Sequence, residues 1–89
     1  MPGYSVEFVK SARKEFEQLP ANVRAKAVEA LGLLAHNPYS ELLKVKKLRD
    51  VKDVYRIRLG DYRIIYELLQ KRLVVLVIKV GHRREIYRR

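Results

Sequence analysis

The sequence contains no cysteine and no tryptophan, and its four glycines are isolated from one another. Without cysteine the chain cannot form a disulfide framework, a thiolate metal site or a cysteine nucleophile, and nothing argues for secretion. Isolated glycines do not make a nucleotide-binding loop. The two histidines, His36 and His82, lack a neighbouring ligand pattern, so we expect no metal site and no other cofactor.

Long apolar runs are also missing. The most apolar run, residues 73–78, is far shorter than the roughly 20 residues of a membrane-spanning helix, and no signal peptide is visible. We therefore expect a cytoplasmic protein with no membrane partner. A chain of 89 residues can build one modest core, which predicts a single domain over residues 1–89.

Positive charge is abundant, and it is confined to the second half of the chain. Residues 1–43 carry five basic and five acidic side chains, whereas residues 44–89 carry fifteen basic and five acidic ones, which leaves the whole net charge of +10 there. This asymmetry indicates a polyanionic partner, with nucleic acid first, an acidic protein segment second and a membrane surface third. The alternative is a solvated basic surface that only aids solubility.

Apolar spacing predicts one strand, two helices and three further strands. The expected strands are residues 4–9, 54–59, 62–69 and 73–80, and the expected helices run from an N-cap at Ser11 to Pro20 and from Pro20 to Asn37. The segment 40–53 is expected to be a basic surface loop with a short turn or strand. The predicted class is α+β, with an antiparallel helix pair packed on one face of a small, mainly antiparallel four-stranded sheet in the order β-α-α-β-β-β.

Residues 55–66, YRIRLGDYRIIY, alternate polar and apolar side chains around a Gly-Asp pair, which is typical of a hairpin with a two-residue turn. The implied cross-strand pairs are Leu59 with Tyr62, Ile57 with Ile64, Tyr55 with Tyr66 and Arg58 with Arg63. Arg56 then shares a face with Arg58 and Arg63, and we call these three side chains the arginine face. We expect the arginine face on the side of the sheet that the helices leave open.

Opposed arginines repel each other, so the arginine face needs an explanation. Guanidinium groups keep their proton and cannot act as bases, but they bind phosphate in a bidentate manner, and a bound phosphate would relieve the repulsion. Solvent screening with outward splay of the side chains explains the same pattern without a ligand. Alternation alone does not decide between the two explanations.

The segment GHRREIY, residues 81–87, adds His82, Arg83 and Tyr87 after the last strand. Metal-free RNA cleavage needs a base for the ribose 2′-OH, a cation at the phosphate and an acid for the leaving oxygen. Imidazole suits proton transfer near neutral pH, and a tyrosine stacks on a base or transfers a proton if cations lower its pKa. The ordinary alternatives are a surface histidine and a tyrosine packed on the sheet edge.

Taken together, the pattern LRDVKDVYRIRLGDYRIIYEL followed by VLVIKVGHRREIYRR resembles the RelE/ParE superfamily of toxins, and within it the RelE-type mRNA interferases. The resemblance implies a ribosome-dependent endoribonuclease that cuts mRNA in the ribosomal A site by 2′-OH attack, without a metal. It also implies three partners, namely mRNA, the ribosome with its rRNA, and a cognate acidic antitoxin protein that neutralises the toxin.

By position, the resemblance assigns catalytic roles to Arg56, Arg58, Arg63, Arg83 and Tyr87. RelE toxins carry lysines where this chain has Arg56 and Arg58, and arginine cannot replace lysine as a base. Our hypothesis is that His82 or Tyr87 takes that role.

Further basic residues are expected to bind RNA, namely Lys44, Lys46, Lys47, Arg49, Lys52, Arg84 and Arg88. Two alternative functions share the fold or the charge. One is a ParE-like inhibitor of DNA gyrase, and the other is an RNA- or ribosome-binding module without catalysis.

Overall fold

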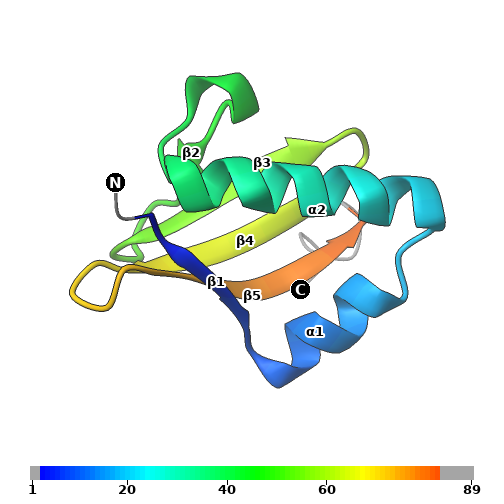
Figure 1. The fold of residues 1–89 in the computed structure, drawn as a ribbon, viewed down its shortest axis with the longest axis horizontal. Helices are drawn as coiled ribbons and strands as arrows, with labels where there is room; N and C mark the ends of the chain where they lie inside the picture. Colours follow the sequence, from blue (N-terminus) through cyan, green and yellow to red (C-terminus); the bar gives the residue numbers. More distant parts are fainter. Residues whose placement is uncertain (1–2, 83–89) are drawn as a thin grey trace.

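The computed structural model describes residues 3–82, in which two helices pack against one side of a five-stranded sheet (Figure 1). The elements in chain order are β1 Ser5–Phe8, α1 Lys10–Glu17, α2 Ala21–His36, a 3-10 helix Glu41–Leu43, β2 Lys46–Lys47, β3 Val54–Leu59, β4 Tyr62–Leu69 and β5 Val74–His82. The predicted α+β class is confirmed, and the predicted helices and strands occur in the predicted order.

The strands are arranged in the order β1-β5-β4-β3-β2. β1 pairs with β5 in parallel, and all other neighbours are antiparallel. The predicted count of four strands is wrong, because Lys46 and Lys47 pair with Arg56 and Tyr55 to add the short edge strand β2. The aliphatic strand β5 is interior, between β1 and β4, as its composition suggests.

The β3–β4 hairpin has the predicted register in every pair, including Arg58 opposite Arg63. Gly60 occupies the first turn position with φ of 65°, which glycine adopts without steric cost and which is typical of a type II′ turn. The alternation of the hairpin sequence therefore fixes which side chains face the helices.

The first helix starts two residues earlier than predicted. Val9 is its N-cap, not Ser11, and Val9 is extended because its N–H still donates to the Val77 carbonyl of β5. Strand pairing thus ends where the helix begins. At the next turn, the Arg24 side chain donates to the carbonyls of Glu17 and Leu19, at 3.2 and 3.1 Å, and so satisfies the C-terminal end of α1.

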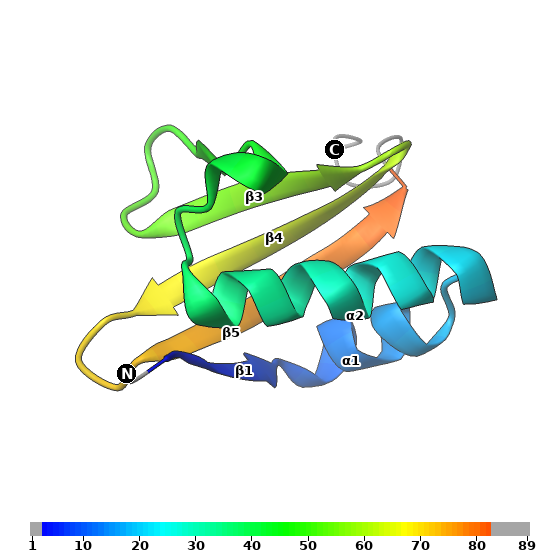
Figure 2. The same ribbon diagram turned by 45° about the horizontal axis from the view of Figure 1, so that its top comes forward.

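The chain runs out along α1 and returns along α2 in the opposite direction, on one side of the sheet (Figures 1 and 2). α2 buries Ala27, Ala30, Leu31 and Leu34. They belong to one core with sheet residues Ile57, Ile64, Tyr66, Leu68, Val75, Val77 and Val80. The helices leave the opposite side of the sheet open. None of the helices within residues 3–82 has the length and apolarity needed to span a membrane.

Candidate functional site

The arginine face lies on the open side of the sheet, and β2 extends it. Lys46 pairs with Arg56, Arg56 with Ile65, and Ile65 with Lys79, so a row of side chains on one face crosses four strands. A second row contains Arg58, Arg63 and Gly81. The structure therefore brings Lys46 together with the three arginines, as the edge pairing of β2 requires.

Arg58 and Arg63 differ in depth. Arg58 is exposed, whereas Arg63 is only 4% exposed, and its Nη1 donates to the carbonyls of Gly60 and Tyr62 at 3.1 and 3.2 Å. These carbonyl oxygens place negative partial charge against the buried guanidinium, which offsets the repulsion from Arg58. In this arrangement Arg58 is open to a ligand, while Arg63 holds the turn.

A bulge in the β4–β5 pairing decides which side chains at the end of β5 lie on the arginine side of the sheet and which lie on the helix side. The register shifts between Ile65 and Tyr66, so that Val77 is opposite Tyr66 but Lys79 is opposite Ile65. Simple alternation from Val77 would place Lys79 towards the helices and His82 with the arginines. Because the bulge reverses the alternation, Lys79 lies on the arginine side and His82 lies on the helix side.

The Lys79 side chain does not stay over the arginine face. Its ammonium donates to Glu15 of α1 at 2.8 Å, and the second oxygen of Glu15 accepts the Val80 N–H at 2.9 Å. This carboxylate covers the edge of β5 beyond the last residue that pairs with β1. Nothing in the sequence pattern of either segment indicated this contact.

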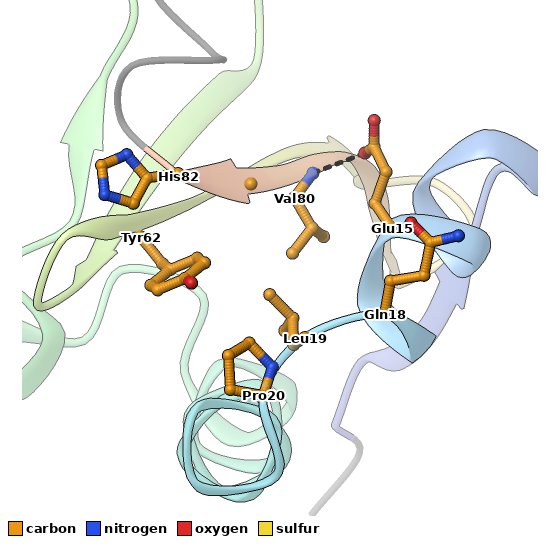
Figure 3. A pocket seen from close by; sticks show the side chains of 8 residues that line it. Glu15, Gln18, Leu19, Pro20, Tyr62, Val80 and His82 are labelled. Atoms are coloured by element: carbon orange, nitrogen blue, oxygen red, sulfur yellow. Dashed lines mark hydrogen bonds between the residues drawn. The ribbon is translucent and has the colours of Figure 1, made fainter.

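The structure does not bring the His82 ring onto the arginine face. His82 pairs with Tyr62 across the strands, and the two rings meet edge to face with centroids 5.4 Å apart. Both rings border a pocket of about 230 Å³ between the end of the sheet and the α1–α2 turn (Figure 3). The proton-transfer role of His82 stays a prediction.

The remaining predicted RNA-binding residues spread over two sides of the sheet. Lys46 is on the arginine side, Lys47 is opposite Tyr55 on the helix side, and Lys44, Arg49 and Lys52 are exposed in the segments around β2. Lys44 has φ of 51° and ends the 3-10 helix. Arg83, Arg84, Tyr87 and Arg88 lie outside the described residues.

Two tyrosines of the hairpin, Tyr55 and Tyr66, belong to the core and not to the site. Tyr66 is fully buried, stacks on Tyr55 with ring centroids 5.8 Å apart, and donates its hydroxyl to the Pro38 carbonyl at 2.7 Å. Burial raises the pKa of Tyr66 well above its usual range, and the neighbouring phenols of Tyr55 and Tyr39 add to the increase. Tyr66 therefore stays protonated at neutral pH.

Between residues 3 and 82, no group of three or more His, Asp or Glu side chains is placed to hold a metal ion. What the site offers is cationic, with guanidinium groups on an open β-surface and a pocket with aromatic walls at one end. Such a surface binds phosphate groups and can stabilise negative charge that develops on them.

Comparison with protein families identifies the superfamily of the chain. Residues 6–87 match the family described as the ParE toxin of the type II toxin–antitoxin system parDE. The chain belongs to the RelE/ParE toxin superfamily. This confirms the resemblance inferred from the hairpin and from the end of the last strand.

Relatives within the superfamily carry RelE-type names. Toxin RelG of Mycobacterium tuberculosis is 35% identical, with 97% of this chain and 98% of the relative covered. The mRNA interferase toxin RelE of Escherichia coli is 34% identical, with 94% of this chain and 90% of the relative covered.

Solved RelE structures have the same fold. The isolated Escherichia coli RelE toxin superposes with a TM-score of 0.79 at 33% identity, covering 89% of this chain and 83% of that one. The archaeal RelE–RelB complex from Pyrococcus horikoshii also gives 0.79 at 33% identity, covering 91% and 96%. The RelE/ParE architecture thus holds over nearly the whole chain.

Proposed function

We propose that this RelE/ParE protein is an endoribonuclease toxin that cleaves mRNA in the ribosomal A site. The observation that carries the proposal is the arginine face with Arg56, Arg58 and Arg63 on the open side of the sheet. Further support comes from the similarity to a relative named mRNA interferase toxin RelE. The RNA-binding surface of the proposal extends across β2 through Lys46.

In the proposed reaction the ribose 2′-oxygen attacks the neighbouring phosphate, and the bond to the 5′-oxygen breaks to leave a 2′,3′-cyclic phosphate. Negative charge grows on the phosphate oxygens in the transition state. Arg58, together with Arg56 and Arg83, would bind these oxygens through paired N–H donors. Arg63 would contribute by holding the Gly60 turn beside Arg58, through its two carbonyl contacts.

The proposal assigns proton transfer to His82 or Tyr87. The His82 ring packs against Tyr62 on the helix side, so it would have to pass round the end of β5 to reach a phosphate on the arginine face. Tyr87 is for this reason the first of the two to substitute. A Tyr87→Phe variant that retains full cleavage would exclude the phenol as acid or base.

The proposal also includes an antitoxin of RelB type and a cytoplasmic site of action. Similar solved structures are RelE–RelB complexes, among them those from Pyrococcus horikoshii and Escherichia coli. A net charge of +10 favours an antitoxin whose contacting segment is acidic. Such a partner would compete with RNA wherever it covers the arginine face.

A second candidate function is inhibition of DNA gyrase, because the matching family is named for ParE toxins. This activity would rest on protein binding, and it would not require the phosphate-binding arginines. The two functions therefore differ in their response to loss of Arg58.

Primer extension on a defined mRNA tests the proposal in a reconstituted translation reaction, with and without ribosomes. The proteins are the wild type, Arg58→Ala, Arg83→Ala and the control Arg72→Ala, whose exposed side chain lies in the β4–β5 loop at the other end of the sheet. We expect ribosome-dependent cuts at A-site codons from the wild type and the control, and a loss of at least about tenfold in both test variants.

Uncut mRNA with folded wild-type protein would contradict the proposal. A gyrase supercoiling assay on the same preparation would then test the second function. Ribosome binding without cleavage or gyrase inhibition would instead identify a non-catalytic binding module.

A further inference from the structure

The pocket of about 230 Å³ beside Tyr62 and His82 has no role in phosphate binding as described above. We infer that it receives one unpaired RNA base next to the cleaved phosphate and that Gln18 and Tyr62 help to select that base. The inference rests on the proposed ribonuclease function and names a base-recognition subsite for it.

The lining of the pocket matches the surface of a base. Tyr62 and His82 form an aromatic wall, and Leu19 and Pro20 from the α1–α2 turn supply apolar surface opposite (Figure 3). Glu15 and Gln18, from the end of α1, add polar groups. A base has flat apolar faces and a polar edge, and proteins bind unpaired bases through aromatic stacking together with hydrogen bonds to that edge.

Two side chains in the pocket have hydrogen-bonding groups available. Within residues 3–82, neither the Gln18 amide nor the Tyr62 hydroxyl makes a hydrogen bond, and Gln18 is exposed. The Glu15 carboxylate is held in place by Lys79 and the Val80 N–H. The pocket therefore combines a fixed acceptor with an amide and a phenol that can both donate and accept.

The pocket and the arginine face meet at the end of the sheet. Tyr62 and Arg63 are consecutive on β4 and point to opposite faces, and Gly81, which lines the pocket, is the cross-strand partner of Arg63. Only the thickness of the sheet separates the two sites there. An RNA strand that passes round the end of β5 can place a phosphate at the arginines and an adjacent base in the pocket.

Binding to the isolated protein is tested first, since it does not depend on cleavage. The four nucleoside 5′-monophosphates and ribose 5-phosphate are titrated into the isotope-labelled wild type, and backbone amide shifts are followed by NMR. We expect shifts at Gln18, Leu19 and Gly81 with the nucleotides, affinities that differ at least threefold among the bases, and no such shifts with ribose 5-phosphate. Equal shifts with ribose 5-phosphate, or none at these amides, would overturn the inference.

Cleavage preference is tested on a pool of mRNAs with varied codons. Gln18→Ala and Tyr62→Phe keep the apolar lining. Gln70→Ala is the matched control, because Gln70 follows the last residue of β4, at the other end of that strand from Tyr62. We expect the base frequencies around the cut to change at least threefold in one or both test variants and to stay unchanged in the control. Unchanged base frequencies in both test variants, with active enzyme, would refute base selection while the ribonuclease function stands.

If the wild type cuts no RNA, the proposed function fails, and the NMR titration alone decides whether the pocket binds a base.

Discussion

The Glu15 carboxylate accepts a hydrogen bond from the Val80 backbone N–H at 2.9 Å, which joins α1 to the exposed edge of β5. β1 pairs with β5 only as far as Val77, so the backbone beyond that point needs another partner. The carboxylate supplies one and binds Lys79 as well, at 2.8 Å. Helix α1 thereby fixes the end of β5, which borders the candidate site.

Two substitutions of Glu15 should separate the contribution of its hydrogen bond with Val80 from that of its ion pair with Lys79. Glu15→Ala leaves the Val80 N–H without an acceptor, and we expect a loss of about 1–2 kcal/mol in the free energy of unfolding. Glu15→Gln keeps an oxygen acceptor and loses only the half-exposed ion pair, so its cost should stay below about 1 kcal/mol. Urea titration of the three proteins measures both, and equal stability of all three would contradict a role for this contact.

Loss of Arg58 should weaken RNA binding and reduce its salt dependence. Arg58 is exposed on the arginine face, so Arg58→Ala removes one phosphate contact, at a cost of about 1–2 kcal/mol. The slope of log K against log salt for single-stranded RNA should become shallower by about 0.7. Fluorescence anisotropy with a non-cleavable 2′-deoxy-substituted oligonucleotide measures both. Arg72→Ala should keep the wild-type slope, and an equal change in the two variants would indicate non-specific attraction only.

Tyr66 should make the fold sensitive to alkaline pH. Its folded-state pKa is raised by burial, so above about pH 10 the unfolded phenol loses its proton while the folded one keeps it. Unfolding is then favoured increasingly as pH rises through that window, and the contribution is constant below it. Denaturant titrations between pH 8 and pH 11 should show a weaker decline for Tyr66→Phe than for the wild type.

The same substitution should cost about 1–3 kcal/mol at neutral pH, because the Pro38 carbonyl loses its hydroxyl donor. Parallel pH curves for Tyr66→Phe and the wild type would show that the phenol does not contribute to the alkaline decline.

Two neighbouring leucines of α2 provide a matched test of the core. Leu34 is fully buried and Leu33 is 37% exposed. Leu34→Ala should lower the free energy of unfolding by about 2–5 kcal/mol, and Leu33→Ala by less than about 1 kcal/mol. Thermal unfolding followed by circular dichroism compares them, and similar costs would mean that α2 packs on the sheet through a different face.

Much of the arginine face follows from the sequence by itself. Side chains alternate across a strand, and a Gly-Asp turn fixes how two strands meet, so residues 55–66 determine the pairs from Arg58 with Arg63 to Tyr55 with Tyr66. The element order and the family follow from patterns of the same local kind. The sequence allows a short turn or strand within residues 40–53, but it does not give the position or the pairing of β2, because two exposed lysines have no apolar periodicity.

Other features depend on tertiary structure. A bulge in the β4–β5 pairing puts Lys79 on the arginine side and His82 on the helix side, and bulges leave no clear trace in alternation. The depth difference between Arg58 and Arg63 and the link from Glu15 to Val80 arise from packing of segments far apart in the chain. The alternation of polar and apolar residues shows which side chains of one strand share a face. The relative register of distant strands and the positions of helices over their edges are set only when the core packs.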